Sequence, residues 1–207
     1  MRVLGLDEAG RGAVLGPLVV GAFLVEDAAL ERLGATGVTD SKLLSAARRE
    51  ALLDPLAAIG QWAVERIQPA QIDEGNLNTL EEDAFVRLIL SLRPDRVIID
   101  APCNPRGIPA FCKRLLSRLD YTPGLLVEPK ADLNHRPCGA ASVFAKVHRD
   151  QALRSLGAAE VIGSGYPSDP VTRAWIQGFL SRGEALPDAV RRRWGTIGAL
   201  QQQSLFG

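Results

Sequence analysis

Short runs of hydrophobic residues open the chain and predict two strands. Val3–Leu6 and Pro17–Val25 are apolar runs of strand length, and the segment Gly10–Gly16 between them is rich in glycine. Clusters of glycine and proline between apolar runs mark turns. The pattern therefore predicts two neighbouring strands joined by a turn whose backbone is exposed.

Helical and extended patterns alternate along the rest of the chain. Helices are predicted over residues 40–58, 79–92, 109–119 and 139–156, and strands over 62–67, 97–100 and 125–127. Asp40 or Ser41 is the expected N-cap of the first helix, and Asn78 or Thr79 starts the second. A continuous apolar triplet just before Asp100 is typical of a central strand buried on both faces. Alternating strands and helices predict the α/β class with a mixed central sheet flanked by helices.

The last part of the chain lacks a strand pattern. Beyond Val171 the spacing of apolar residues predicts two short helices, over 172–182 and 187–194. We therefore expect a single α/β domain over residues 1–160 and a C-terminal loop with a helical appendage packed on it over 161–200. Residues 201–207 are expected to form a flexible tail. A chain of 207 residues is long enough to bury one full hydrophobic core.

Composition and charge narrow the classes of function. The longest apolar run near the N-terminus, Leu15–Val25, is too short to cross a bilayer, and we expect no secretory leader before it. We expect a cytoplasmic protein without membrane association. Cys103, Cys112 and Cys138 match no zinc spacing and are expected to be reduced thiols. Because 24 basic residues balance 24 acidic ones, any phosphate binding must be local.

Two adjacent carboxylates follow the first apolar run. Asp7 and Glu8 come directly before the turn Gly10-Arg11-Gly12. Neighbouring side chains of a strand point to opposite faces, so both acids reach one site only where the pleat breaks. The glycines permit such a break. The alternative is an ordinary polar strand end followed by a turn.

Two further acids occupy positions that suit a binding site. Asp100 ends the buried strand, where an α/β sheet presents groups to a ligand, and Asp132 lies in a loop before the last long helix. Four carboxylates in one place would repel and raise one another's pKa values unless cations held them. Oxygen ligands favour magnesium or manganese over zinc. The four acids therefore predict a site for hard divalent metal ions.

The last long predicted helix carries a polar stripe. Ser142, Lys146 and Arg149 share one face and could contact successive phosphates. The alternative is a solvated face on which Lys146 pairs with Asp150. Tyr166 follows in a loop rich in glycine and proline, where a ring either stacks on a sugar or base or packs locally.

Together these segments resemble the ribonuclease HII family, from Leu4 to about Trp175. The matching segments occur in the family's order: Gly5–Gly12, Gly16-Pro17, Asp40–Leu43, Ile99–Pro102, Lys130–Asp132, Ala140–Ser142, Ala145–Val147, Arg149-Asp150 and Gly163–Pro170. The Ala-Pro after Asp100 and the last of these segments are similar to archaeal members. The resemblance implies a ribonuclease-H-like fold with a C-terminal helical appendage.

The resemblance also implies an activity. Members of the family are endonucleases that hydrolyse the RNA strand of RNA/DNA hybrids and cut 5′ of single ribonucleotides embedded in duplex DNA, which serves DNA repair and replication. They use two magnesium or manganese ions and leave 3′-hydroxyl and 5′-phosphate ends. The acids implied to bind the metals and to be catalytic are Asp7, Glu8, Asp100 and Asp132.

Contacts with the substrate are implied by the same resemblance. Gly10, Arg11 and Gly12 would recognise the ribose 2′-hydroxyl, largely through backbone groups, and Tyr166 would stack on the following deoxyribose. Phosphate contacts are implied for Lys42, Asn78, Ser142 and Lys146. The sequence does not decide whether Asn76 or Asn78 is the asparagine expected by the family.

The C-terminus suggests a partner. Residues Gln202–Phe206 are similar to a short peptide by which bacterial proteins dock on the replication sliding clamp, and the alternative is an unstructured end. The family resemblance suggests a monomer. A function of another class would be a non-catalytic module of the same fold that binds RNA/DNA hybrids, but the presence of all four acids favours the enzyme. The Asp7-Glu8 doublet and the segment around Tyr166 argue against a type 1 ribonuclease H or a resolvase.

Overall fold

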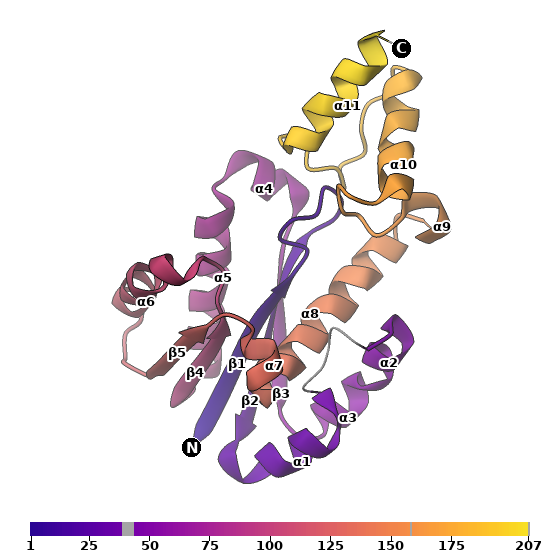
Figure 1. Cartoon of the computed structure of the whole chain (residues 1–207). Coiled ribbons are helices and arrows are strands. Elements are labelled where there is room, and N and C mark those ends of the chain that lie inside the picture. Colours follow the sequence, from indigo (N-terminus) through magenta and orange to yellow (C-terminus); the bar gives the residue numbers. More distant parts are fainter. Residues whose placement is uncertain (39–43, 158, 207) are drawn as a thin grey trace.

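A five-stranded mixed sheet forms the centre of the molecule (Figure 1). The computed structural model describes residues 1–38, 44–157 and 159–206. The strands are β1 (Arg2–Ala9), β2 (Leu18–Glu26), β3 (Gln61–Ile67), β4 (Arg96–Asp100) and β5 (Gly124–Glu128), arranged in the order β3-β2-β1-β4-β5. β2 is antiparallel to β1 and β3, whereas β4 is parallel to β1 and β5. The predicted α/β class with a mixed sheet is confirmed.

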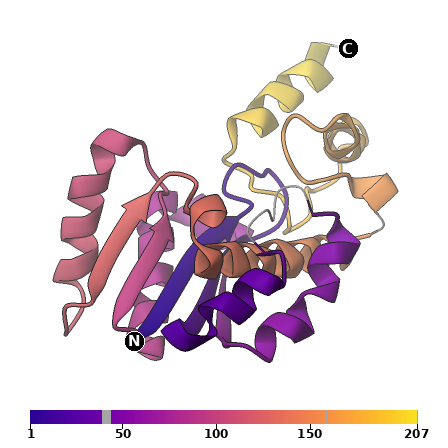
Figure 2. The ribbon, with the colours of Figure 1, turned by 60° about the horizontal axis from the view of Figure 1, so that its bottom comes forward.

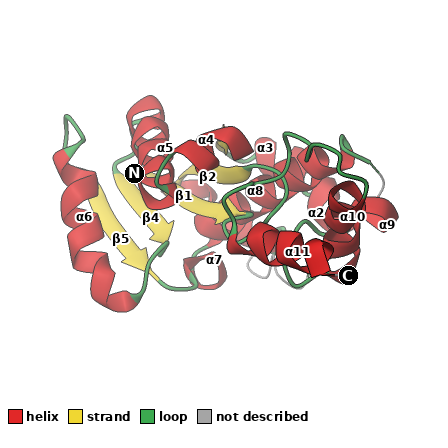
Figure 3. Ribbon diagram, turned by 90° about the horizontal axis from the view of Figure 1, so that it is seen from above, coloured by secondary structure: helices red, strands yellow, loops and turns green. Residues whose placement is uncertain are grey.

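Helices cover both faces of the sheet (Figures 2 and 3). They are α1 (Leu30–Ala35), α2 (Ala46–Ala51), α3 (Leu53–Ala57), α4 (Pro69–Glu74), α5 (Leu77–Leu92), α6 (Ile108–Ser117), α7 (Ala131–Asn134), α8 (Arg136–Arg154), α9 (Ala159–Ile162), α10 (Pro170–Ser181) and α11 (Gly195–Phe206). On one face α5 and α6 meet, where the rings of Phe85 and Phe111 pack edge to face. On the other face α8 packs against β2, and α1 and α3 pack on α8.

Helix α8 lies directly on β1 and β2. A Cβ atom at Gly5 would stand 2.1 Å from the carbonyl carbon of Pro137, and one at Gly21 would stand 2.2 Å from the carbonyl oxygen of Ala141. Any larger residue at either position would push the helix away from the sheet. Because α8 carries part of the predicted site, these two glycines set its distance from the acids of β1.

The appendage of α9, α10 and α11 lies beyond one end of the sheet (Figure 1). It has its own small core, formed by Val14, Leu15, Leu153, Ile162, Ile176, Val190, Ile197 and Leu200. Two of these residues, Val14 and Leu15, come from the loop between β1 and β2. The appendage therefore packs on the loop that contains the Gly-Arg-Gly turn.

The helix predicted over residues 40–58 is two short helices. α2 is capped by Ser45, whose hydroxyl accepts a hydrogen bond from the backbone N–H of Arg48 at 3.2 Å. Pro55 has no N–H to donate to the preceding turn, which separates α3 from α2. The expected caps Asp40 and Ser41 lie outside the described residues.

The prediction of a helix over residues 187–194 is wrong. That segment contains turns and a β-bridge between Leu15 and Val190. The side chain of Arg191 is bonded to backbone carbonyls of the β1–β2 loop, which favours an irregular chain over a helix. The helix comes later as α11, and it continues to Phe206, where a flexible tail was expected.

Two further expectations concern the membrane and the thiols. In the described part of the chain, no helix combines the length and apolarity that a bilayer span requires. Cys103, Cys112 and Cys138 are free cysteines, as predicted. Cys138 is buried under α8, where its thiol donates to the carbonyl of Ile98 at 3.1 Å.

Candidate active site

Three carboxylates from three separate elements meet where β1 and β4 end. One oxygen each of Asp7, Asp100 and Asp132 lies within 4.8 Å of the other two, which is close enough to hold a metal ion. Asp7 and Asp132 are buried and Asp100 is half-buried. The Asp100 carboxylate accepts a hydrogen bond from the backbone N–H of Ala131 at 3.1 Å, which ties α7 to the end of β4. The sequence placed these acids in separate segments, and the fold brings them together.

Glu8 lies next to this cluster. Its backbone N–H donates to the Asp7 carboxylate at 2.8 Å, and its half-buried side chain lines a cavity with Gly10–Gly12. β1 keeps its regular pairing with β2 through Ala9, so the expected break in the pleat at the two acids is absent. Asp7 and Glu8 therefore lie near the end of a regular strand, and the chain leaves the sheet only after Ala9.

Burial and repulsion raise the pKa values of both acids in the doublet. Burial raises the pKa of Asp7 to about 6, although the Ser142 hydroxyl and the Lys146 ammonium act to lower it. Burial raises the pKa of Glu8 to about 8, helped by the negative charges of Asp7 and Asp100. Negative charge is therefore only partly compensated by the protein here. An all-carboxylate group with such an excess fits a hard divalent cation.

Ser142 and Lys146 of α8 lie against the acids. Ser142 is fully buried, and its hydroxyl accepts a hydrogen bond from the Lys146 ammonium. Both side chains lower the pKa of Asp7, which places them beside that carboxylate. This part of the predicted stripe therefore faces the acid cluster and is not a solvated surface.

Arg149 and Asp150 continue the site along α8. Arg149 is buried, and its guanidinium donates to the carbonyl of Ser164 at 2.8 Å. Asp150 forms an ion pair with Arg49 of α2 at 3.1 Å. Ser142, Lys146 and Arg149 all lie in α8, as predicted, and their contact with phosphates stays a prediction. At Arg149, however, the guanidinium supports a loop, and the surrounding chain encloses it.

The Gly-Arg-Gly turn has a backbone that suits glycine. Gly10 has φ +88°, in the left-handed region, and a Cβ atom there would stand 2.5 Å from Nε of Arg149. The side chain of Arg11 points to α5, where it donates to the carboxylate of the buried Glu81 and to the side-chain oxygen of Asn78. The loop backbone therefore lines the cavity while the Arg11 side chain is held elsewhere.

The two candidate asparagines have different roles in the structure. Asn76 is the N-cap of α5, and its side-chain oxygen accepts from the backbone N–H groups of Asn78 at 3.0 Å and Thr79 at 3.2 Å. Asn78 instead contacts Arg11 of the turn. Asn78 is thus the asparagine next to the candidate site, and α5 begins slightly before the predicted start.

Tyr166 borders the same cavity. The residue is 37% exposed, and its ring lies under the Arg149 guanidinium, whose central carbon is 4.7 Å from the ring centroid. The cavity has a volume of about 330 Å³ and brings together Glu8, Gly10–Gly12, Lys146 and Tyr166 with Arg49, Arg149 and Asp150. The cavity therefore joins the predicted turn and ring to the acids. Lys42 lies outside the described residues.

Sequence reasoning missed some charged residues of the site. Glu81 holds the Arg11 side chain, and Arg49 lines the cavity. In the sequence both look like ordinary polar positions on helices, and no spacing distinguishes them. Arg149 differs from these two, because it shares a helical face with Ser142 and Lys146 and was identified from that spacing.

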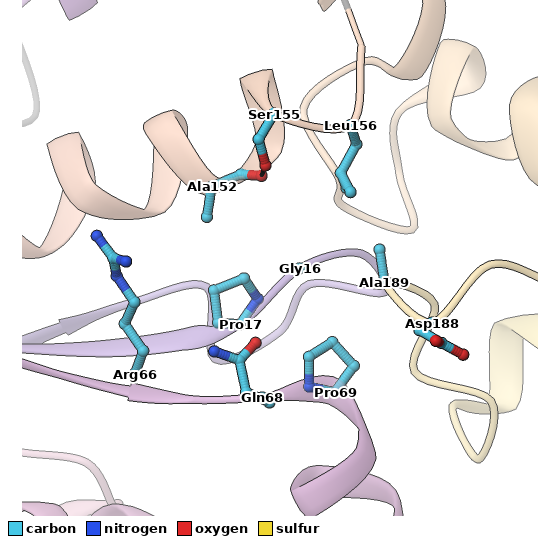
Figure 4. Close-up of a pocket in the computed structure, with 10 residues that line it drawn as sticks. All are labelled: Gly16, Pro17, Arg66, Gln68, Pro69, Ala152, Ser155, Leu156, Asp188 and Ala189. Carbon is cyan, nitrogen blue, oxygen red and sulfur yellow. Dashed lines mark hydrogen bonds between the residues drawn. The ribbon is translucent and has the colours of Figure 1, made fainter.

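A second cavity lies near the C-terminal end of α8 (Figure 4). Its volume is about 350 Å³, and it is lined by Gly16, Pro17, Arg66, Gln68, Pro69, Ala152, Ser155, Leu156, Asp188 and Ala189. None of the predicted site residues is among these. We therefore place the active site at the acid cluster and the cavity beside it.

Comparison with known proteins identifies the family. The model of the family described as Ribonuclease HII matches residues 4–197. The ribonuclease HII of Thermococcus onnurineus is 38% identical over 209 residues, covering 98% of this chain and 91% of that protein. The ribonuclease H2 of Pyrococcus horikoshii superposes with a TM-score of 0.90 at 35% identity, over 100% of both chains. A PCNA:RNase HII complex from Archaeoglobus fulgidus matches with a TM-score of 0.84 at 33% identity, over 94% of this chain and 95% of that chain.

The family match spans the part of the chain in which the four acids lie, and these relatives are archaeal, as the sequence motifs indicated. Together with the carboxylate cluster, it confirms the resemblance and the predicted enzyme class. The chain belongs to the ribonuclease HII family, and it is a metal-dependent endoribonuclease of the type 2 ribonuclease H class.

Proposed function

We propose that the protein hydrolyses the RNA strand of RNA/DNA hybrids and cuts duplex DNA on the 5′ side of single embedded ribonucleotides. The products would carry 3′-hydroxyl and 5′-phosphate ends. The main support is the cavity where the Gly10–Gly12 backbone, the Tyr166 ring and Glu8 meet beside the acid cluster. Such a reaction removes ribonucleotides from the genome, so we assign the protein to DNA repair and replication in the cytoplasm, acting as a monomer.

The proposed metal site has four acids. Asp7, Asp100 and Asp132 would hold one magnesium or manganese ion, and Glu8 would help to hold a second. When bound, the ions would activate water for in-line attack on phosphorus and stabilise the leaving 3′-oxygen. The all-oxygen donor set and the raised pKa values of Asp7 and Glu8 support this proposal. Lys146 would hold a positive charge beside Asp7 and face the substrate phosphate.

Recognition of the ribose would come from the loop backbone. Gly12 is exposed, and a Cβ atom there would meet nothing within 4 Å, so the peptide groups around it are open to a ligand. A 2′-hydroxyl both donates and accepts hydrogen bonds, which matches N–H and C=O groups. A DNA strand lacking that hydroxyl would leave these groups unpaired.

Tyr166 would stack on the deoxyribose that follows the ribonucleotide. Its ring is held from one side by Arg149, which leaves the other side for the substrate. Asn78 would position the phosphate backbone near Arg11, and Lys42 would contact a further phosphate. Ser142 is buried against Asp7, so its contribution would be to hold the acid and Lys146 in place.

The C-terminus would dock on a sliding clamp. The similar structure from Archaeoglobus fulgidus is an RNase HII in complex with PCNA, which supports a clamp partner for this chain. We propose Gln202–Phe206 as the contact, with Leu205 and Phe206 as buried anchors. Deleting residues 202–207 should abolish retention on a clamp column and leave hydrolysis unchanged. Equal retention of the two proteins would refute the clamp proposal.

The proposed substrate can be tested with duplexes that differ in one oxygen atom. Two DNA duplexes of the same sequence, one with a single ribonucleotide and one without, are incubated with the protein and Mg²⁺ or Mn²⁺. We expect one cut, 5′ of the ribonucleotide, with a 3′-hydroxyl that a polymerase can extend. If the protein cut a long RNA/DNA hybrid but neither DNA duplex, its function would be restricted to hybrids. Cutting of both DNA duplexes would refute ribose recognition.

A further inference from the structure

A single buried arginine holds the loop that forms the proposed ribose site. Arg191 follows α10 and is 0% exposed. Its Nε donates to the carbonyl of Gly16 at 3.0 Å, its Nη1 to that of Arg11 at 3.1 Å and its Nη2 to that of Gly10 at 2.7 Å. One guanidinium from the C-terminal appendage therefore contacts both ends of the β1–β2 loop.

The backbone around this arginine is also tied to the loop. The N–H of Arg191 donates to the carbonyl of Val14 at 2.9 Å. On the other side, the N–H groups of Val14 and Leu15 donate to the carbonyl of Gly165 at 2.8 and 3.1 Å. Gly165 directly precedes Tyr166. The loop is thus fixed between the appendage and the segment that carries the tyrosine.

These contacts set the direction of two peptide groups. In a trans peptide the C=O and the following N–H point in opposite directions. The described chain contains no cis peptide bond. Because Arg191 draws the carbonyls of Gly10 and Arg11 toward itself, the N–H groups of Arg11 and Gly12 point away from it. Gly10, Arg11 and Gly12 line the cavity, and the Arg11 side chain is bonded to Glu81, so the loop offers backbone groups to this space.

The guanidinium is enclosed yet keeps its charge at neutral pH. Burial lowers the pKa of Arg191 to about 10, with a smaller effect from the positive charge of Arg149. The ring of Trp194 covers one face, at 5.0 Å from its centroid to the guanidinium carbon. A charged donor in a water-poor environment forms stronger hydrogen bonds than a neutral one. The loop carbonyls are therefore held firmly.

We propose that Arg191 is a positioning residue for ribonucleotide recognition, which orients the N–H groups of Arg11 and Gly12 toward the 2′-hydroxyl without touching the substrate. This inference rests on the proposed function, in which these amides recognise the ribose. It makes the C-terminal appendage part of the recognition site. Lysine cannot replace this arginine, because its donors radiate from one nitrogen and cannot reach three separate carbonyls.

The test compares Arg191→Lys with Arg193→Lys as a matched control. Both changes keep the charge, but Arg193 is exposed, and its backbone N–H donates to Asp73 at 3.0 Å. The dissociation constants are measured for the duplexes with and without one ribonucleotide, in Ca²⁺, with gels to verify that the strands stay intact. Values of kcat and KM follow with the ribonucleotide duplex in Mn²⁺, and thermal unfolding with and without Mn²⁺ reports on the acid cluster.

We expect Arg191→Lys to reduce the preference for the ribonucleotide duplex on the order of tenfold, as for the loss of one well-oriented hydrogen bond. Its affinity for the all-DNA duplex and its thermal shift with Mn²⁺ should stay at the wild-type values, which a general structural defect would not allow. Arg193→Lys should match the wild type throughout.

Other outcomes separate the two proposals. If the wild type prefers the ribonucleotide duplex and Arg191→Lys keeps the full preference, the positioning role is refuted and the proposed function stands. If the wild type shows no preference, the proposed function fails and the role of Arg191 fails with it. If Arg191→Lys does not fold, Arg191→Gln, which keeps a planar polar side chain but cannot reach all three carbonyls, is measured in the same way. An unchanged preference in that variant would likewise refute the positioning role.

Discussion

In the metal-free protein, the buried carboxylate of Asp7 should lower the free energy of unfolding, and a bound metal ion should restore it. Burial raises the pKa of Asp7 to about 6 from the ordinary 3.8. The folded state therefore binds more protons than the unfolded state between these values, so the stability of the metal-free protein falls as pH rises through that window. At about 1.4 kcal/mol per pH unit, the ionised carboxylate costs up to about 3 kcal/mol above pH 6. A divalent ion at the cluster would offset this cost.

The variant Asp7→Asn removes the ionisation and keeps the shape of the side chain. We expect it to be more stable than the wild type in EDTA at pH 8, by up to about 3 kcal/mol, and to differ little at pH 4, where the wild-type acid is mostly protonated. Asp54→Asn, at an exposed position of α3, is the matched control and should change little at either pH.

Urea unfolding in EDTA at pH 4 and pH 8, followed by circular dichroism, measures these differences. Mn²⁺ added at pH 8 should stabilise the wild type and the Asp54 variant but much less the Asp7 variant. A destabilising role of the ionised Asp7 is refuted if Asp7→Asn is less stable than the wild type in EDTA at pH 8. Metal binding by Asp7 is refuted if Mn²⁺ stabilises both proteins equally.

Substitutions at three further positions have defined outcomes. Gly10 has φ +88°, and the Cβ of Gly10→Ala would stand 2.5 Å from Nε of Arg149, so this variant should lower the unfolding free energy by about 2 kcal/mol and reduce cleavage at single ribonucleotides. Wild-type values in both the urea and the cleavage assay would contradict the loop geometry. Gly21→Ala, with its Cβ 2.2 Å from the Ala141 carbonyl, should cost about 3 kcal/mol in urea unfolding by displacing α8, and a neutral effect would contradict the close packing. Tyr166→Ala should lower kcat/KM about tenfold at a single ribonucleotide while Tyr166→Phe keeps it, and equal losses in both variants would exclude stacking.

The strands could be predicted from the sequence because each is an apolar run ended by turn residues or acids. The five observed strands match the predicted segments to within a few residues at each end. The helices α1 and α4 were not predicted, because six residues are too few to show a helical period. A helix was predicted over residues 187–194 because the apolar residues there have helical spacing. The segment is irregular because Arg191 bonds to a distant loop.

The acids of the site could be predicted from their positions at strand ends. The carboxyl ends of parallel strands lie at one edge of a sheet, which explains Asp7 and Asp100, and Asp132 was identified by its motif. The charged residues that hold the loop could not be predicted, because in a sequence a buried arginine or glutamate looks like a surface residue until its partner is known. Glu81 and Arg191 each contact a loop far away in sequence.

The metal-dependent active site is tested by cleavage of a duplex with one ribonucleotide, measured for the wild type and for Asp132→Asn in Mn²⁺ at pH 8. Asp132 is fully buried in the carboxylate cluster, and the substitution removes one negative charge while keeping the size of the side chain. We predict that the wild type cuts 5′ of the ribonucleotide, and that the variant binds the duplex but loses cleavage on the order of a hundredfold or more. Cleavage by the variant at the wild-type rate would contradict a metal-dependent active site formed by these acids.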